Sequence, residues 1–233
     1  MAISRRFKEG ISKLEEGKEY AFDEAIDALL EFPKAKFDET VELSFNLGID
    51  TRKSDQALRG TLSLPHGTGK DVRVVVIAQG DDATAAEEAG ADHVGHEDLI
   101  KKISDGWLDF DVMISTPENM RHLGKLGRVL GPRGLMPSPK AGTVTKDVAT
   151  AVKEVKAGKI EFKADKGANL HVPIGKISFA KDKLKENGLA VISTVIKARP
   201  SAAKGTFIKS MTLSSTMGPG LRINTKEAAS IMR

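Results

Sequence analysis

Apolar residues recur along the chain with two different periods. Helical spacing runs through residues 3–17 and 21–32, and the second pattern ends before Pro33. Its shared face holds Ala25, Ile26, Leu29 and Leu30. Residues 40–49 alternate instead, which predicts a half-buried strand with Val41, Leu43, Phe45, Leu47 and Ile49 on one side. After a polar loop at 50–56, residues 57–65 predict the partner of that strand.

The pattern changes after the break at 65–70. Residues 72–78 are almost wholly apolar, which is typical of a strand buried on both faces of a parallel sheet. Strands and helices then alternate, which predicts a layered α/β arrangement. We expect a strand at 111–115 and helices at 81–91, 96–106, 116–130 and 146–158. In the helix at 116–130, Thr116 is the predicted N-cap and Pro117 the first helical residue.

The last third mixes strands with one long helix. We predict strands at 160–167, 169–175 and 207–215, and a helix at 179–198 followed by a basic linker. The last strand runs into the turn STMGPG. No internal repeat and no low-complexity segment is present in the sequence.

Composition narrows the class of protein. The 233 residues are 40% apolar and 29% charged, as expected for a globular chain of one or two domains. No apolar run is long enough to span a membrane, and the first residues lack the apolar core of a signal peptide, so we expect a cytoplasmic protein. The chain has no cysteine, which excludes disulfides, thiolate metal sites and cysteine nucleophiles.

Positive charge gathers in the last third. Residues 1–67 hold 10 Lys and Arg against 13 Asp and Glu, and residues 68–159 hold 13 against 14. Residues 160–233 hold 13 against 5. Such asymmetry favours a polyanionic partner, and a solvated lysine-rich surface is the alternative.

Catalytic and ligand-binding motifs are absent from the sequence. The segment HGTGKD fails as a phosphate loop because Leu64 and Asp71 stand where glycine and a hydroxyl residue are needed. His93 and His96 lack further ligands. We therefore expect no catalytic residue, metal or cofactor. Two alternatives stay open: a nucleotide-binding enzyme using 66–70 and 131–137, and a protein-interaction module.

Two loops combine glycine, proline and basic side chains, at 127–143 and 215–222. Each is either an ordinary turn or a site where phosphate approaches the backbone. Aromatic residues make up only 5% of the chain, which disfavours base stacking on single strands. Recognition of a folded RNA by its shape needs no aromatic residues.

Six blocks of the sequence resemble, in order, those of the L-one family of ribosomal proteins in its bacterial form, the family of the mobile stalk of the large subunit. They are KFDETVEL (36–43), LGID (47–50), RGTLSLPHGTGK (59–70), LGRVLGPRGLMPSPKAGTVT (126–145), ADKGANLHVPIGK (164–176) and STMGPG (215–220). A small departure is Ser138, where the family often has asparagine.

The resemblance implies an α/β protein of two domains. One is an α+β sandwich built from both chain ends, residues 1–67 plus 160–233, which binds RNA. The other is an inserted three-layer, Rossmann-like α/β domain at 68–159. The basic last third belongs to the implied RNA-binding domain.

The resemblance also implies a set of RNA-contacting residues. In this sequence they are Lys36, Phe37, Thr40, Lys166, Gly167, His171, Ser210, Thr216, Met217 and Gly218. We expect the lysines to meet phosphates, the hydroxyls of Thr40, Ser210 and Thr216 to donate to ribose and phosphate oxygens, and Phe37 and Met217 to touch sugars or bases. For Phe37, packing in the core remains an equal alternative.

The function implied by the resemblance is structural and non-enzymatic. The implied partners are large-subunit ribosomal RNA, transfer RNA leaving the exit site, and the protein's own messenger RNA, whose translation it represses. The implied location is the ribosome in the cytoplasm, with no membrane partner, and the free protein is expected to be a monomer.

Overall fold

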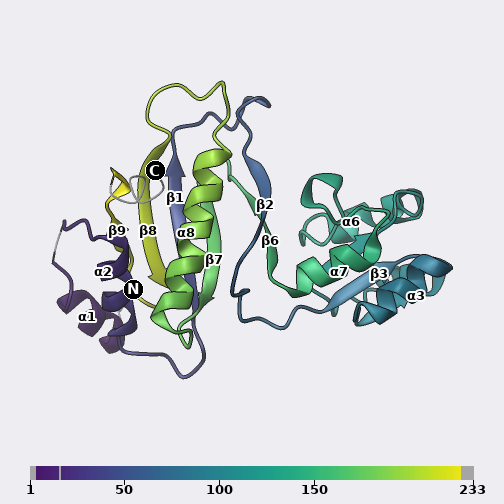
Figure 1. Ribbon diagram of the computed structural model, residues 1–233, viewed down its shortest axis with the longest axis horizontal. Coiled ribbons are helices and arrows are strands. Elements are labelled where there is room, and N and C mark those ends of the chain that lie inside the picture. The colour runs from purple at the N-terminus through teal and green to yellow at the C-terminus, as the bar shows by residue number, and fades with distance from the viewer. Residues whose placement is uncertain (1–3, 16, 227–233) are drawn as a thin grey trace. The chain divides into compact units, whose positions relative to one another are not determined.

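The computed structural model describes residues 4–15 and 17–226, and the mixed α/β class predicted from the sequence is confirmed. The chain divides into two compact units (Figure 1). The first combines the residues up to Gly69 with those from Phe162 onward, and the second spans Lys70–Glu161. The predicted domain borders lie two residues earlier at both junctions. Independent folding and separate functions of the two parts stay predictions.

A four-stranded antiparallel sheet forms the centre of the first unit, in the order β7-β1-β8-β9. Its strands are β1 (Thr40–Leu47), β7 (Asn169–Lys176), β8 (Ile208–Ser215) and β9 (Leu221–Ile223). The alternation expected for β1 is present, since every second residue from Val41 to Leu47 is buried. Leu43 lies between Val172 of β7 and Leu213 of β8, so one face of the sheet is apolar across the strands.

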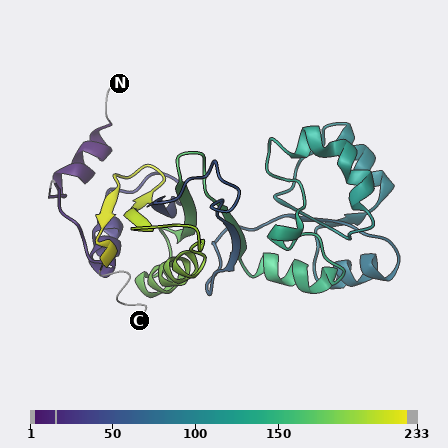
Figure 2. The same ribbon diagram turned by 90° about the horizontal axis from the view of Figure 1, so that it is seen from above.

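Two helices, α2 (Phe22–Leu30) and α8 (Lys181–Lys197), pack on that apolar face (Figures 1 and 2). Their close approach depends on Gly188, because a Cβ atom there would lie 2.2 Å from Cζ of Phe22. The buried Asn187 donates to the carbonyl oxygens of Ile174 (2.8 Å) and Gly67 (2.9 Å), so this polar core residue is satisfied. No described helix of the first unit covers the opposite face.

The strand pairing predicted for residues 57–65 is wrong. They form β2 (Arg59–Ser63), which pairs with β6 (Lys159–Lys163) in a separate two-stranded sheet. None of the β2 residues is buried, and Leu62 is its single large apolar side chain. β2 therefore lacks the apolar face that a neighbour of β1 needs, whereas β7 and β8 both have one.

A three-stranded parallel sheet in the order β4-β3-β5 lies at the centre of the second unit. Its strands are β3 (Val74–Ile77), β4 (His93–Gly95) and β5 (Val112–Ser115). One face packs against α3 (Asp81–Glu88) and α7 (Val148–Lys156). The other packs against α4 (Glu97–Ser104), α5 (Met120–Leu123) and α6 (Gly127–Leu130), so this unit has three layers (Figure 2). All four residues of β3 are buried, as its apolar sequence predicted.

The single helix predicted for 116–130 is wrong. The structure has α5, a 3₁₀ turn at Gly124–Leu126 and α6, and Thr116 is buried before them without capping a helix. Glycines at 124 and 127 lower the helical stability of this stretch. Asn119 occupies the N-cap position, but its side chain donates instead to the Ile77 carbonyl of β3 (3.1 Å).

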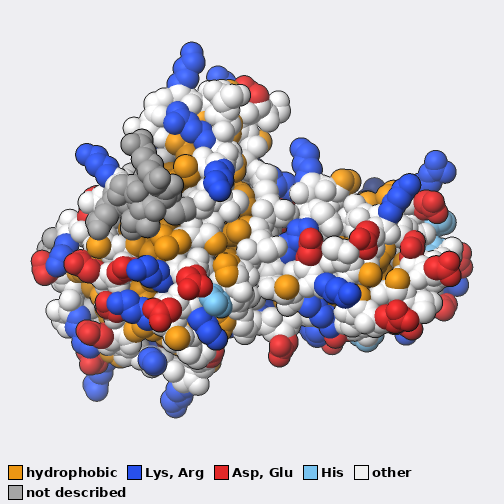
Figure 3. Space-filling view, in the orientation of Figure 1, with side chains coloured by type: hydrophobic (Ala, Val, Ile, Leu, Met, Phe, Trp, Pro, Cys, Tyr) orange, Lys and Arg blue, Asp and Glu red, His pale blue; other side chains and the backbone are white. Residues whose placement is uncertain are grey.

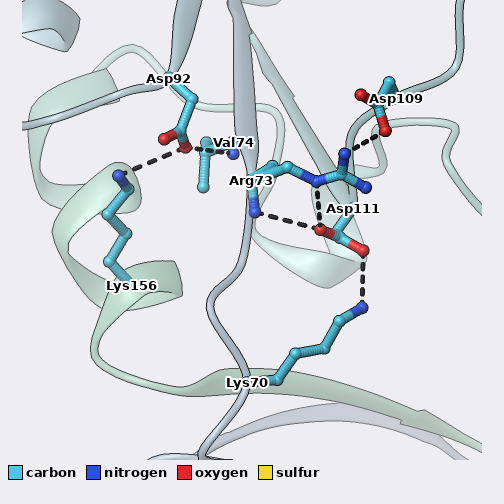
Figure 4. A network of polar contacts seen from close by, with 7 residues as sticks. All are labelled: Lys70, Arg73, Val74, Asp92, Asp109, Asp111 and Lys156. Carbon is cyan, nitrogen blue, oxygen red and sulfur yellow. Dashed lines mark hydrogen bonds and ion pairs between the residues drawn. The ribbon is translucent and has the colours of Figure 1, made fainter.

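Carboxylates hold the starts of the parallel strands together (Figure 4). Asp92, just before β4, accepts hydrogen bonds from the backbone N–H of Val74 (2.8 Å), and Lys156 lies 3.3 Å away. Asp111, just before β5, accepts from Lys70 Nζ (2.6 Å) and from the backbone and Nε of Arg73. These hydrogen bonds lower the pKa of both carboxyls, chiefly through Val74 for Asp92 and through Lys70 for Asp111.

The histidines considered as metal ligands have other neighbours. His93 lies edge-on to Trp107, with 5.0 Å between ring centroids, and His96 Nε2 is 3.0 Å from Asn119 Oδ1. Among residues 4–15 and 17–226, no group of three or more His, Asp or Glu side chains is arranged to hold a metal ion. Within the same ranges, no helix is long and apolar enough to cross a membrane.

Candidate nucleic-acid interface

The uncovered face of the first unit's sheet is polar. The alternation that buries Val41 to Leu47 turns every other β1 residue to this side, and the neighbouring strands do the same. We call this surface the open face. Its residues are Thr40, Glu42, Ser44 and Asn46 of β1, Asn169, His171, Pro173 and Lys176 of β7, Ser210, Thr212 and Ser214 of β8, and Arg222 of β9.

Contacts between neighbouring strands orient the side chains of the open face. Asn46 Nδ2 donates to Asn169 Oδ1 (2.8 Å), and Ser44 Oγ lies 3.0 Å from His171 Nδ1. His171 Nδ1 is also 4.0 Å from a carboxylate oxygen of Glu42. The open face is therefore a set of oriented donors and acceptors around an exposed imidazole, which suits contacts with ribose and phosphate oxygens.

One end of the open face is bordered by two exposed apolar side chains. Phe37, in the loop before β1, is 53% exposed, and Met217, in the turn after β8, is 51% exposed. Phe37 is therefore not a core residue, which removes one of the two alternatives for it. Both side chains are therefore accessible to a partner that lies on the open face.

Thr216 fastens the turn after β8 to the start of β1. Its hydroxyl accepts from the Thr40 backbone N–H (3.0 Å) and donates to the Thr40 carbonyl (3.3 Å), to which the Thr216 backbone N–H also donates (3.0 Å). The Thr40 hydroxyl in turn accepts from Lys176 Nζ (2.9 Å). Thr216 thus positions the turn. Its hydroxyl can donate to an RNA oxygen only if it breaks its hydrogen bond to the Thr40 carbonyl oxygen.

The buried carboxylate of Glu39 organises this end of the sheet. Oε1 accepts from the Ala35 backbone N–H (2.8 Å) and from Arg6 (3.2 Å). Oε2 accepts from the Ser215 hydroxyl (2.7 Å) and the Met217 backbone N–H (3.0 Å). With 2% of its surface exposed, Glu39 joins the loop before β1, the turn after β8 and α1 (Arg5–Ser12).

The pKa of Glu39 reflects these contacts. Burial alone would raise it, but the hydrogen bonds from Ser215, Met217 and Ala35, with the charge of Arg6, outweigh burial and hold the pKa below its ordinary value. Glu39 is therefore ionised at neutral pH, and its four donors keep a fixed acceptor.

The turn after β8 needs its glycines for close packing. A Cβ on Gly218 would lie 2.5 Å from Oγ of Ser215, and one on Gly220 would lie 2.9 Å from Thr212. Pro219 is buried beside Gly10 of α1. The turn is thus a compact structure that contacts Thr40, Glu39 and Gly10 of α1.

Residues 29–219 match the Ribosomal protein L1p/L10e family. A curated relative from Protochlamydia amoebophila (strain UWE25), named large ribosomal subunit protein uL1, is 52% identical over 225 residues, which are 97% of this chain and 95% of the relative. The chain belongs to the Ribosomal protein L1p/L10e family. The resemblance drawn from the sequence blocks is confirmed. The family match contains β1, β7 and β8 and ends inside the turn after β8.

In this L1p/L10e family member, the predicted contact residues form two groups. Lys36, Phe37, Thr40, Thr216, Met217 and Gly218 lie at the end of the sheet that Glu39 organises. Lys166, Gly167 and Ser210 lie toward the other end, where Ser210 faces Asn46 in β1. The ends are about 20 Å apart along β1, at roughly 3.3 Å per residue, and His171 lies between them.

The second group includes a turn held by Asp165. Its carboxylate accepts from the backbone N–H groups of Asn169 (2.7 Å) and Gly167 (2.8 Å). These bonds, chiefly those from Asn169, lower the pKa of Asp165. The Lys166 carbonyl accepts a hydrogen bond from the Thr51 hydroxyl (3.0 Å), which fixes the backbone at this position. The Lys166 side chain is exposed.

Sequence reasoning missed Glu39 and most of the open face. Glu42, Ser44, Asn46, Thr212 and Ser214 were not proposed as contacts. Their signal was present, because the period of two that predicted the buried residues of β1 also assigns the residues between them to one surface. The burial of Glu39 also had a signal in the sequence. Glu39 is two residues before Val41, so in an extended strand its carboxylate lies on the same, buried side as Val41.

Proposed function

We propose that this chain is a structural protein of the large ribosomal subunit that binds ribosomal RNA with the open face and the turn after β8. The observation that carries the proposal is an uncovered polar sheet face bordered by exposed Phe37 and Met217. The named function of the relative, a large-subunit protein, supports the choice of ribosomal RNA.

The proposed contacts follow from side-chain chemistry. Lys36 and Lys166 meet phosphates at the two ends of the open face. His171, between the ends, and Ser210, at the end that carries Lys166, contact ribose or phosphate oxygens. Phe37 and Met217 lie against sugars or base faces. Gly167 and Gly218, which lack side chains, let the RNA backbone come close. Recognition then depends on RNA shape, because the oriented groups of the open face have fixed spacing.

The finer parts of the function belong to the same proposal. The chain would assist the release of transfer RNA from the exit site and repress translation of its own messenger RNA. Repression follows if the messenger carries a copy of the ribosomal site, since free protein occupies it only when ribosomal RNA is scarce. A structural role at the ribosome involves no catalysis, and the proposed location is the ribosome.

The enzyme alternative has less support. In the segment HGTGK, the backbone N–H of His66 donates to Asn187 (3.0 Å), and the His66 ring contacts Glu186 of α8. These contacts indicate that the segment HGTGK packs against α8 and has a structural role. Calorimetry with a nucleoside triphosphate at millimolar concentration should show no binding, and a clear signal would favour the enzyme.

A binding experiment with paired variants tests the proposal. Phe37→Ala with Met217→Ala removes both exposed apolar contacts and should lower affinity for a stalk ribosomal RNA fragment by at least about tenfold, or about 1.4 kcal/mol. Ile196→Ala is the control, because this half-buried residue lies on α8, on the helical side of the sheet. Equal affinity of the double variant and the wild type would contradict the proposal.

A further inference from the structure

The second unit has an uneven distribution of charge. Residues 119–146 contain six Lys and Arg and no Asp or Glu, whereas the rest of Lys70–Glu161 contains seven Lys and Arg against 15 acidic residues. Residues 119–146 are thus a purely basic segment in a unit that has a net negative charge elsewhere. In the space-filling view, lysine and arginine side chains project from the upper edge of this unit, where Figure 1 places α6 (Figure 3).

Three of these basic residues share one side of a helical stretch. Arg121, Lys125 and Arg128 are spaced by four and three residues along α5, the 3₁₀ turn and α6, so they project in one direction. We call them the basic strip. The opposite side of the stretch packs in the core through Leu123, Leu126 and Leu130, which are all buried. The backbone that carries the basic strip is therefore held in place by the core of the second unit.

The charges of the basic strip are available to a partner. All three side chains are exposed, and none forms an ion pair or a side-chain hydrogen bond within the described part of the chain. Four cations elsewhere in this unit form ion pairs with carboxylates, namely Lys70, Arg73, Lys156 and Lys159. Three unpaired cations on one side of a helix repel one another slightly, and a bound polyanion relieves that repulsion.

We propose that the basic strip binds the phosphate backbone of a folded RNA, as a second RNA-binding surface beyond the open face. The strip spans about 10 Å at roughly 1.5 Å per residue, which matches about three successive phosphates of one strand. Residues 119–146 contain no Phe, Trp or Tyr, so the contact involves the backbone without base stacking. An acidic protein surface is disfavoured because the loop that follows, 131–142, is rich in Gly and Pro and lets a backbone approach closely.

This inference rests on the proposed function, because it assumes an RNA partner for the chain. The shared chemistry is the RNA phosphate backbone, and its source is either stalk ribosomal RNA or transfer RNA. Backbone binding is independent of sequence, so it differs from the shape-dependent contact proposed for the open face.

The test uses the full chain with Arg121→Gln, Lys125→Gln and Arg128→Gln combined. The matched control is Lys101→Gln, Lys102→Gln and Lys153→Gln, which removes the same charge from exposed positions of α4 and α7 in the same unit. Both are titrated with a stalk ribosomal RNA fragment and with transfer RNA over a range of salt concentrations. Fluorescence of Trp107, the one tryptophan of the chain, checks that the second unit stays folded.

We expect the strip variant to bind one or both RNAs at least about tenfold more weakly at low salt. The slope of log affinity against log salt should shrink by about 2 to 3, corresponding to three lost phosphate contacts. Arg121→Lys with Arg128→Lys should bind like the wild type, because it keeps the charge. The RNA whose affinity falls identifies the source of the phosphates.

The proposal is overturned if the strip variant binds both RNAs as the wild type does, or if strip and control variants lose affinity equally. Failure of the proposed function gives a different result, in which the wild type itself does not bind the stalk fragment or binds it independently of Phe37 and Met217.

Discussion

A single buried side chain determines the geometry of the proposed binding end. Glu39 is itself buried, yet it holds the backbone of Met217 and the loop that leads to Phe37. Its contribution to binding is therefore indirect. Removing the charge of Glu39 should change both the stability of the first unit and its affinity for RNA.

Glu39→Gln tests this positioning role. One carboxylate oxygen becomes an NH₂ group that faces two donors, so we expect the first unit to lose about 1–3 kcal/mol of unfolding free energy. RNA affinity should fall as well, although residue 39 is buried. Urea unfolding followed through Tyr20, the one tyrosine and a buried residue of the first unit, measures the loss. Glu42→Gln, on the open face, is the stability control and should unfold like the wild type.

Thr216→Ala should weaken binding of stalk ribosomal RNA by about 1–3 kcal/mol. The substitution removes the hydroxyl that fastens the turn to Thr40. Filter binding measures the change, and Thr206→Ala, an exposed loop position, serves as the control. Thr216→Ser keeps the hydroxyl and should retain affinity. If Thr216→Ala binds as tightly as the wild type, the turn does not depend on this contact.

Among the elements, strands with a clear period were the easiest to predict. β1, β3, β7 and β8 all occur where the pattern indicated. The short strands β4 and β9 were not predicted, because three residues show no period. The pairing of β2 was wrong because period alone does not identify a partner, and the helix at 116–130 was wrong because two glycines and the bond from Asn119 to β3 interrupt it.

The carboxylates at the start of the parallel strands predict how the second unit responds to acid. The pKa values of Asp92 and Asp111 are lowered by hydrogen bonds in the folded state. Their stabilisation is thus fully present above the ordinary carboxyl pKa of 3.8 and is lost as the pH falls toward the lowered folded values. The urea concentration at the midpoint of unfolding, followed by Trp107 fluorescence, should decrease as the pH is lowered below 3.8. Asp111→Asn should make that drop smaller, and an unchanged pH dependence would contradict this role.

At the scale of the whole molecule, two compact units divide the functions that we propose. The first unit carries the open face, and the second carries the basic strip. Both chain segments of the first unit contribute to its sheet, because β1 pairs with β7 and β8, which follow the inserted unit in the sequence.

Replacing residues 70–161 with a short linker should leave a folded first unit that still binds stalk ribosomal RNA tightly. All residues of the open face and of the turn after β8 lie outside the deleted segment. Binding assays measure affinity, and Tyr20 fluorescence confirms folding. A folded deletion variant without RNA binding would contradict the assignment of the binding surface to the first unit.

The sequence by itself determined the family, the mixed α/β class, the main strands and helices, and the concentration of basic charge in the last third. These properties follow from local order, period and composition. The tertiary structure decided that Phe37 is exposed, that Glu39 is a buried acceptor for four donors, and that Thr216 is bound to Thr40. Each of these depends on which distant segments meet. Such pairings arise from the packing of whole apolar faces, which no local pattern specifies.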